Sequence, residues 1–337
     1  MTLSITIYGA GAVGCTFAAH LSTIPPAIAS LTLIGRGEHL HAIRRNGLHY
    51  IEQDKARHIA INATDNPTSL DKQDIIFLCT KAHQLPTLAP TLQALLKEES
   101  IVIPVCNGIP WWLLYGLTPA HNNNHIPLLD PQRALADTIA LPQIIGAVTY
   151  MGAAIESPGK VINHASPFLQ LGNPSTQPSS RMEKCDKLLK KSTLSYSVSS
   201  NIYISIFNKL CWNIAFNCLS ILHQADSQTM ANDTAICTRA RALMKEVEHI
   251  AQSYNIPFTV DVDKHIHSAQ KAGAHKPSML QDYEQHKALE TDAILFAPHD
   301  LAKRQHLDTT AISALCEDMQ NFLANTIPGW CRQFARV

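Results

Sequence analysis

The sequence predicts an α/β fold with a doubly wound parallel sheet, followed by an all-helical second part. Short apolar runs alternate with helical patterns in the N-terminal half, which is the order that a parallel sheet requires. A glycine-rich turn follows the first apolar run, and beyond Ser200 almost every pattern is helical. A chain of 337 residues is long enough for two domains. We therefore expect a first domain at residues 1–199 and a second at residues 200–337.

The elements of the first domain can be placed from its apolar runs. Strands are expected at 5–8, 31–34, 74–79 and 101–105, and helices at 12–22, 39–46 and 88–97. The last two strands are apolar runs apart from Asp74, as in strands buried on both faces. Residues 145–171 carry further β-rich runs with a turn at Pro158-Gly159. The polar stretch 118–142, which contains three consecutive Asn residues, is interpreted as a surface insertion.

Five helical patterns fill the second domain. They cover residues 204–224, 233–254, 262–272, 278–296 and 309–324. Ser278 precedes the fourth pattern and is expected to be its N-cap. With Gln281 it would form a capping box.

Charge and cysteine usage exclude several classes of protein. Lys plus Arg and Asp plus Glu both number 27, so the chain has no basic footprint and no nucleic-acid partner is expected. The nine scattered cysteines form no cluster with zinc spacing, which predicts no metal site and favours a reducing compartment. Neither a signal peptide nor a run of about 18 apolar residues is present, so we expect a soluble, cytoplasmic protein without a membrane partner.

The glycine-rich turn carries the first functional motif. Its residues fit GxGxxG between a strand and a helix, and they are Gly9, Ala10, Gly11, Ala12, Val13 and Gly14. The first glycine permits the turn, the second lets a pyrophosphate approach the backbone, and the third lets helix pack on strand. Phosphates would then sit at the helix N-terminus. The motif predicts a dinucleotide site, and the alternative is a turn chosen for packing alone.

The residue after the second strand indicates which dinucleotide binds. An NAD site usually has Asp or Glu there to hold the ribose 2′-hydroxyl. This chain has Gly35-Arg36, and its first acid, Glu38, already lies in the next helix. The Arg36 guanidinium could meet a 2′-phosphate, so NADP is favoured over a merely solvated arginine.

Two further polar residues follow buried strands. Lys81 comes after the strand at 74–79, and Asn107 comes after the strand at 101–105. The carboxyl ends of parallel strands form the edge at which open α/β sheets bind ligands. Together with the glycine turn, the two residues indicate one cleft.

A polar stripe crosses an otherwise apolar helix in the second domain. Lys209, Asn213 and Asn217 stand at i, i+4 and i+8, so they share one face. Such groups are costly to bury unless they are hydrogen-bonded or face a wet cleft. The stripe therefore favours a functional site over a solvent-facing surface stripe. Glu290 by its own pattern is interpreted as an ordinary exposed residue.

The whole constellation resembles the ketopantoate reductase family. The resemblance runs from Ile5 to about Leu315 and adds Ser278-Met279-Leu280-Gln281-Asp282 and Leu289-Glu290-Thr291-Asp292 to the motifs above. It implies NADPH-dependent reduction of 2-dehydropantoate to (R)-pantoate, in pantothenate and coenzyme A biosynthesis. The implied fold is a Rossmann-like domain followed by a helical domain like that of 6-phosphogluconate dehydrogenase.

The resemblance also implies roles for individual residues. Lys209 matches the family's catalytic lysine, which stabilises oxyanion charge and delivers a proton, and Glu290 matches a catalytic acidic residue beside cofactor and substrate. The implied substrate-binding residues are Asn107, Lys209, Asn213, Asn217 and Ser278. Besides the glycine turn, the implied cofactor-binding residues are Arg36, Lys81, Asn107 and Glu290.

Several positions depart from the usual family pattern and leave the substrate open. They are Cys218, Leu289, Leu295-Phe296 and Thr310. The alternatives are a reductase of another 2-keto acid, an opine-type dehydrogenase, and a nucleotide-binding sensor that has lost turnover. The joint retention of Lys209, Asn213, Ser278 and Glu290 argues against the sensor, because a sensor needs no proton donor. The sequence leaves the oligomeric state open, with a homodimer as one option.

Overall fold

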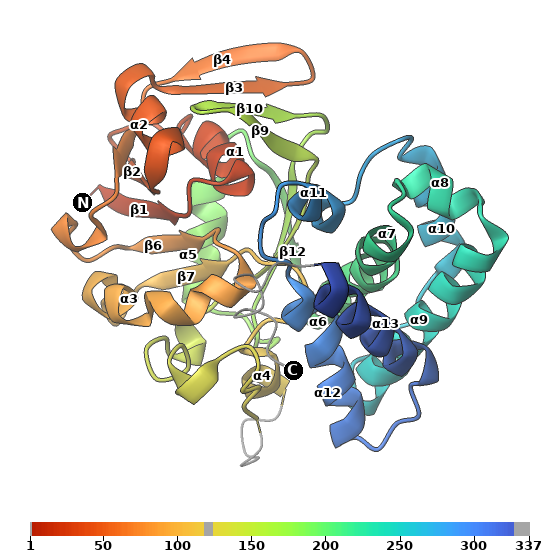
Figure 1. Ribbon diagram of the computed structural model, residues 1–337. Helices are drawn as coiled ribbons and strands as arrows, with labels where there is room; N and C mark the ends of the chain where they lie inside the picture. The colour runs from red at the N-terminus through yellow and green to blue at the C-terminus, as the bar shows by residue number, and fades with distance from the viewer. Residues whose placement is uncertain (1, 118–123, 327–337) are drawn as a thin grey trace. The chain divides into compact units, whose positions relative to one another are not determined.

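The computed structural model describes residues 2–117 and 124–326 (Figure 1). The chain forms two compact units, one made of Met1–Cys106 with Trp111–Ile202 and the other of Asn107–Pro110 with Tyr203–Val337. The first unit holds all three β-sheets, and the second is helical. The expected fold class is therefore confirmed. The structure assigns four residues of the N-terminal half, Asn107–Pro110, to the helical unit.

A five-stranded parallel sheet forms the centre of the first unit. Its strand order is β5 (Asn62–Thr64), β2 (Ala29–Ile34), β1 (Leu3–Tyr8), β6 (Ile75–Leu78) and β7 (Ile101–Pro104), and every pair is parallel. Strands β6 and β7 are buried at every position, as their uninterrupted apolar runs predict. The chain order reverses between β1 and β6. In sheets of this kind the carboxyl ends of the strands open a crevice at the reversal.

Short helices lie between the strands of the first unit. They are α1 (Ala12–Leu21), α2 (Gly37–Asn46), the 3₁₀-helix η2 (Ala82–Leu88), α3 (Ala89–Leu95), α4 (Leu113–Leu117) and α5 (Ser180–Leu189). Helix α1 packs on the sheet through Phe17, whose ring centroid lies 5.7 Å from that of Phe77 on β6. This contact anchors the helix that begins at the glycine turn.

Two smaller sheets complete the first unit. One has the order β4 (Lys55–Ile59), β3 (Leu48–Glu52), β10 (Lys160–Asn163) and β9 (Ala153–Ser157), and the other β12 (Ser195–Ser199), β11 (Phe168–Gly172) and β8 (Gly146–Tyr150). The expected turn at Pro158-Gly159 joins β9 to β10. The β3–β4 hairpin was not expected, because its turn residues Gln53 and Asp54 adopt φ of 46° and 66° without a glycine.

The interpretation of residues 118–142 as a surface insertion is wrong for the part that the structure describes. Residues 118–123 lie outside the described residues, but Ile126, Leu135 and Ile139 are at most 2% exposed. The buried Asp130 carboxylate accepts hydrogen bonds from the backbone N–H groups of Leu135 (2.8 Å) and Ala136 (3.0 Å). The apolar residues are spaced several positions apart, so polar neighbours dominate the local composition and hide a packed segment.

The second unit is built from helices. They are α6 (Ile202–Trp212), the π-helical turn η5 (Asn213–Asn217), α7 (Cys218–His223), α8 (Ser227–Asn232), α9 (Thr234–Ser253), α10 (Val262–Lys271), α11 (Ser278–Glu284), the π-helical turn η6 (Asp292–Phe296), α12 (Ala297–Arg304) and α13 (Thr310–Thr326). Within the described ranges, no helix is both long and apolar enough to cross a membrane.

The single helix expected at 278–296 is wrong. Helix α11 ends at Glu284, and His286 then adopts a left-handed φ of 54°. Helical structure resumes only after Glu290 and continues through η6 and α12, with Pro298 just after the π-helical turn. The interruption places Glu290 on an irregular segment instead of a helix face.

Candidate active site

The glycine turn has the steric requirements of a dinucleotide-binding loop. Gly9 adopts φ of +118°, and a Cβ there would lie 2.8 Å from the Cys79 carbonyl carbon. A Cβ at Gly14 would lie 1.9 Å from the Gly9 carbonyl oxygen. At Gly11, by contrast, no atom lies within 4 Å of the position of a Cβ. Packing alone explains the first and third glycines, and the space at the second fits an approaching pyrophosphate.

The start of α1 suits an anion. Gly11 is the N-cap, so no side chain caps the helix, and the first turn holds no acidic residue. The N–H groups and dipole at such a helix end favour negative charge. The Thr80 hydroxyl oxygen, directly after β6 and Cys79, is buried without a hydrogen-bond partner among the described residues. These features fit the phosphates of a dinucleotide.

Arg36 and Lys81 lie at the same edge of the parallel sheet. A Cβ at Gly35 would lie 2.4 Å from the Ala10 Cβ, so the glycine lets the β2–α2 connection pass against the glycine turn. Arg36 follows as the exposed N-cap of α2. Lys81 is half-buried at the N-cap of η2, just after β6. The structure therefore places both basic residues at the carboxyl ends of strands that flank the turn.

In the second unit, Asn213, Asn217 and Ser278 form one hydrogen-bonded cluster. Asn213 and Asn217 are each 3% exposed, and Asn217 Nδ2 donates to Asn213 Oδ1 at 3.1 Å. Asn217 Oδ1 accepts from the Ser278 hydroxyl at 3.5 Å and from the Met279 backbone N–H at 3.4 Å. The burial of both asparagines contradicts the solvent-facing alternative. We name these three residues the amide cluster.

The prediction that Ser278 caps α11 is wrong. Pro277 is the N-cap, and Ser278 is the first helical residue. The Ser278 side chain turns to Asn217, and Gln281 Nε2 donates to the Lys276 carbonyl instead of completing a capping box. Its role is therefore in the amide cluster.

Lys209 lies on α6, one helical turn before the amide cluster. Its side chain is half-buried, whereas the asparagines that follow it are buried. The helix continues from α6 into the π-helical turn η5, which carries both asparagines. The Lys209 ammonium therefore lies on the same continuous helix as the two amides, one turn before Asn213, as the sequence spacing predicts.

Asn107 and Glu290 meet in the second unit although 183 residues separate them. Asn107 Nδ2 donates to Glu290 Oε2 at 3.2 Å. Glu290 is 6% exposed, so its interpretation as an exposed residue is wrong. The Ile109 N–H donates to the Ala293 carbonyl at 2.7 Å, and a Cβ at Gly108 would lie 2.2 Å from the same oxygen. These contacts attach segment 107–110 to η6 and explain why it belongs to the helical unit.

Sequence reasoning missed Asp292. Its Oδ1 is buried without a hydrogen-bond partner in the described part of the chain, and burial raises the pKa of its carboxyl to about 6. It begins η6, which contacts η5, and π-helical turns are rare and often occur at functional sites. The signal was available, because Asp292 stands two residues after Glu290 in a motif quoted for the resemblance.

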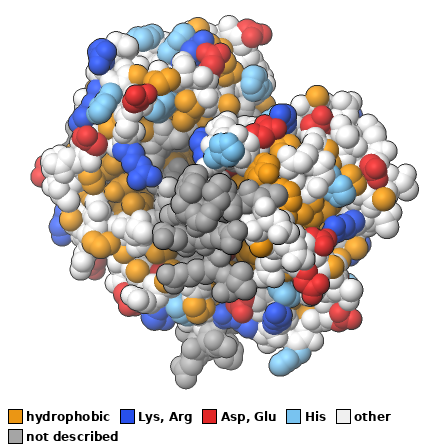
Figure 2. All heavy atoms as spheres, viewed as in Figure 1, with side chains coloured by type: hydrophobic (Ala, Val, Ile, Leu, Met, Phe, Trp, Pro, Cys, Tyr) orange, Lys and Arg blue, Asp and Glu red, His pale blue; other side chains and the backbone are white. Residues whose placement is uncertain are grey.

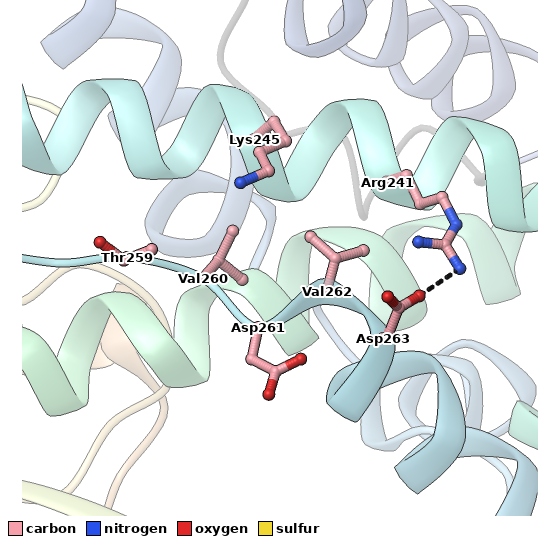
Figure 3. Close-up of a pocket in the computed structure, with 7 residues that line it drawn as sticks. All are labelled: Arg241, Lys245, Thr259, Val260, Asp261, Val262 and Asp263. Carbon is pink, nitrogen blue, oxygen red and sulfur yellow. Dashed lines mark ion pairs between the residues drawn. The ribbon is translucent and has the colours of Figure 1, made fainter.

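A separate groove of about 570 Å³ lies beside α9 in the second unit (Figure 3). Its side chains carry both signs of charge and are already paired, since Arg241 bonds Asp263 at 2.6 Å and Lys245 bonds Glu248 at 2.7 Å. No group of three or more His, Cys, Asp or Glu residues in the described ranges is arranged to hold a metal ion. On the face shown in Figure 2, acidic and basic side chains are interspersed. None of these features indicates a ligand site, in contrast to the glycine turn of the first unit and the amide cluster of the second.

A Rossmann-like unit with this glycine turn, followed by a helical unit with a half-buried lysine beside two buried amides, is typical of the class of nicotinamide-dependent oxidoreductases. Residues 5–175 match the family described as ketopantoate reductase PanE/ApbA, and residues 201–321 match the C-terminal part of the same family. The chain belongs to the ketopantoate reductase family, a family of NAD(P)-dependent 2-keto acid reductases.

Relatives with similar sequences span almost the whole chain. The 2-dehydropantoate 2-reductase of Mesorhizobium japonicum is 31% identical over 313 residues, which cover 93% of this chain and 95% of the relative. The 2-dehydropantoate 2-reductase of Lactococcus lactis is 26% identical and covers 83% and 85%.

Solved structures share the fold. A ketopantoate reductase candidate from Ralstonia solanacearum superposes with a TM-score of 0.88 at 25% identity and covers 97% of this chain and 99% of its own. D-mandelate dehydrogenase with NADH and anilino(oxo)acetate superposes with a TM-score of 0.81 at 23% identity and covers 97% and 100%. The fold is therefore shared by enzymes that act on different substrates.

Proposed function

We propose that this protein reduces 2-dehydropantoate to (R)-pantoate with NADPH. The amide cluster carries the proposal, since its two buried amides, Asn213 and Asn217, follow Lys209 along the same helix, and Asn217 bonds to Ser278. Such a site suits a small, polar, oxygen-rich acid. The similarity over nearly the full length to the Mesorhizobium japonicum enzyme supports this substrate.

The residues of the second unit act on the substrate. When bound, NADPH supplies the hydride that adds to the carbonyl carbon at C2. The Lys209 ammonium stabilises the negative charge that develops on the carbonyl oxygen and donates a proton to it. Asn107, Asn213, Asn217 and Ser278 hold and orient the substrate, and the hydrogen bond from Asn107 fixes the Glu290 carboxylate.

The residues of the first unit bind the cofactor. The N–H groups at the start of α1 receive the pyrophosphate beside the open position at Gly11. Arg36 contacts the 2′-phosphate, which makes NADPH the preferred cofactor. Lys81 contacts the cofactor at the end of β6, and Asn107 and Glu290 contact both ligands.

A second candidate is the reduction of another 2-keto acid. The structural likeness to D-mandelate dehydrogenase favours it, because that enzyme has this fold with a different substrate and with NADH. The departures at Cys218, Leu289, Leu295-Phe296 and Thr310 leave room for a changed substrate site.

A spectrophotometric assay of NADPH oxidation tests both candidates. It uses 2-dehydropantoate, benzoylformate and smaller 2-keto acids, with NADH in parallel. We expect kcat/KM of about 10⁴ M⁻¹s⁻¹ or more with 2-dehydropantoate and NADPH. Turnover with another 2-keto acid alone would establish the second candidate. Tight NADPH binding without turnover of any acid would contradict both and favour a sensor.

A homodimer and a cytoplasmic location remain predictions. A ketopantoate reductase from Staphylococcus aureus with a TM-score of 0.74 is described as dimeric. Light scattering during size-exclusion chromatography would measure the mass directly, and a mass near 37.1 kDa would exclude the dimer.

A further inference from the structure

We propose that strand β12 is an interaction surface, at which two copies of this chain pair edge to edge about Ser197. The two copies of Ser195–Ser199 run antiparallel, so that two three-stranded sheets join into one continuous sheet. The proposal rests on the homodimer predicted above, and it assigns the surface and the residue on the two-fold axis.

Strand β12 forms an open edge of its sheet. It pairs on one side with β11, in parallel from Ser195 to Ser199, and no described strand pairs with its other side. None of its five residues is buried, and Val198 is 48% exposed. Every second residue of such an edge directs its backbone N–H and C=O groups away from the sheet, where a further strand can bind them.

The other edge strands that the structure describes are protected against pairing. Strand β5 has only three residues, β4 carries Lys55 and Arg57, and β9 carries Glu156. Strands β7 and β8 are covered, since β7 is buried at every position and β8 at all but its last. Short length and charge are common means of preventing edge-to-edge association. Strand β12 has five residues without charge or proline, so it lacks this protection.

The sequence of β12 is complementary to itself when one copy is reversed. Ser-Tyr-Ser-Val-Ser places small and large residues in the same order from either end. In an antiparallel pair centred on Ser197, each Ser195 faces a Ser199 and each Tyr196 faces a Val198. An aromatic residue opposite a β-branched one is a favourable cross-strand pair. The pattern therefore fits a second copy of this chain related by a two-fold axis.

Tyr196 is held ready for this contact. Its hydroxyl bonds to Asp186 on α5, so the ring is fixed beside the edge in the single chain. Val198, two residues on, points to the same face of the sheet and is the more exposed of the two. Pairing with a second copy therefore covers Val198 without moving the Tyr196 ring.

Exposed aromatic residues continue the patch onto the neighbouring strands. Phe168 on β11 is paired with Ser195 on one side and with Tyr150 on β8 on the other. The two rings are 36% and 37% exposed, and their centroids lie 6.4 Å apart. A stable interface buries about 800 Å² on each partner, so it needs apolar surface beside the strand pair as well.

A cysteine on the two-fold axis tests the pairing directly. Residues opposite each other in an antiparallel pair have Cα atoms about 4.5–5.5 Å apart, within the range of about 4.4–6.8 Å that a disulfide spans. Ser197→Cys, treated with a mild oxidant, should therefore give a covalent dimer of twice 37.1 kDa on a non-reducing gel. The unsubstituted protein, oxidised in parallel, measures crosslinking through the native cysteines.

Ser195→Cys is the matched control on the same strand. In the proposed register its two copies lie four residues apart along the strands, about 13 Å, which is too far for a disulfide. It should crosslink no more than the unsubstituted protein, whereas the double variant Ser195→Cys/Ser199→Cys should crosslink as Ser197→Cys does. Crosslinking of Ser195→Cys alone, or none in Ser197→Cys, would overturn the proposal.

Light scattering during size-exclusion chromatography distinguishes failure of this inference from failure of the homodimer. Ser197→Lys places two ammonium groups opposite each other and should weaken association at least about tenfold. Ser268→Lys, at an exposed position of α10, adds the same charge and should keep the mass of a dimer. A dimer that Ser197→Lys leaves intact would place the interface elsewhere, and a monomer at every concentration would exclude the homodimer. Either result overturns the proposal, whether or not a 2-keto acid is reduced.

Discussion

The glycine turn of the first unit and the amide cluster of the second are both proposed functional sites, but they are built in opposite ways. At the turn, the absence of side chains at Gly9, Gly11 and Gly14 exposes the backbone. In the cluster, Asn213 and Asn217 are each 3% exposed, and the Asn213 Nδ2 donor has no hydrogen-bond partner among the described residues. The backbone N–H groups at the turn are fixed by the helix, whereas the amides need neighbours to define their direction.

This difference suggests separate tasks, with the turn binding the cofactor and the cluster selecting the substrate. Any pyrophosphate satisfies the helix end, so the turn recognises a cofactor class. Among the residues that the structure describes, neither Asn213 Nδ2 nor Asp292 Oδ1, on the contacting turn η6, has a hydrogen-bond partner. Unpaired buried groups reject ligands that cannot pair with them, so we expect the second unit to select the substrate.

Replacement of Lys209 should have the largest effect, and it tests whether catalysis in the second unit can be lost without loss of cofactor binding. Lys209→Ala should lower kcat by about 10²–10⁴, the range for loss of a general acid. The NADPH dissociation constant, measured by fluorescence titration, should be nearly unchanged because Lys209 is not among the proposed cofactor contacts. An active Lys209→Ala enzyme would remove this residue from the mechanism.

The first-unit side of the contrast can be tested with two glycine substitutions. Gly14→Ala forces a Cβ to within 1.9 Å of the Gly9 carbonyl oxygen, so it should lower the unfolding free energy by about 1–3 kcal/mol. Gly11→Ala meets no protein atom and should leave the melting temperature unchanged while raising the NADPH dissociation constant about tenfold.

If Gly11 faces a bound ligand, thermal melts should show a lower melting temperature for Gly14→Ala only. NADPH titrations should show weaker binding for Gly11→Ala although its melting temperature is unchanged. Equal affinity for NADPH in Gly11→Ala and the unsubstituted protein would show that the phosphates lie elsewhere.

The sequence predicted the turn well because its requirements are local. Strand β1, the glycines and α1 follow one another within the first 21 residues, and the contact that requires Gly14, with the Gly9 carbonyl oxygen, lies inside this segment. The spacing of Asn213 and Asn217 on one helix was predictable for the same reason. Periodicity along one element is visible in the sequence.

The rest of the site depends on contacts between distant segments. Asn107 meets Glu290 across 183 residues, and Asn217 meets Met279 across 62. Glu290 is buried because α11 ends at Glu284 and the chain then continues without regular structure. The hydrophobic periodicity of the sequence does not predict where this helix ends. Ser278 likewise bonds to Asn217 on another helix instead of capping α11, and the sequence did not indicate this partner.

Asp292 gives a prediction about stability and pH. Burial raises the pKa of its carboxyl from 3.8 to about 6, so the folded state holds this proton more tightly than the unfolded state does. Stability should therefore fall as the pH rises from about 4 to 6, by on the order of 2 kcal/mol for this partly buried group. Asn at this position carries no charge at any pH.

Asp292→Asn should accordingly raise the urea midpoint at pH 7–8 and flatten this part of the pH profile. The midpoint at pH 4 should change little, since the unsubstituted carboxyl is then protonated in the folded state. An unchanged profile would mean that Asp292 is paired or hydrated in the folded protein.

Replacement of Arg36 should have the smallest effect, and it compares the affinities for NADPH and NADH directly. Its side chain is exposed at the N-cap of α2, so its bond to a 2′-phosphate competes with water and is worth roughly a tenfold change in affinity. Arg36→Ala should weaken NADPH binding by about that factor and leave NADH binding unchanged. Arg45→Ala, at the exposed end of the same helix, controls for the loss of one positive charge. If both cofactors weaken equally, Arg36 acts on a group that they share, and cofactor choice must then come from other residues at this edge of the sheet.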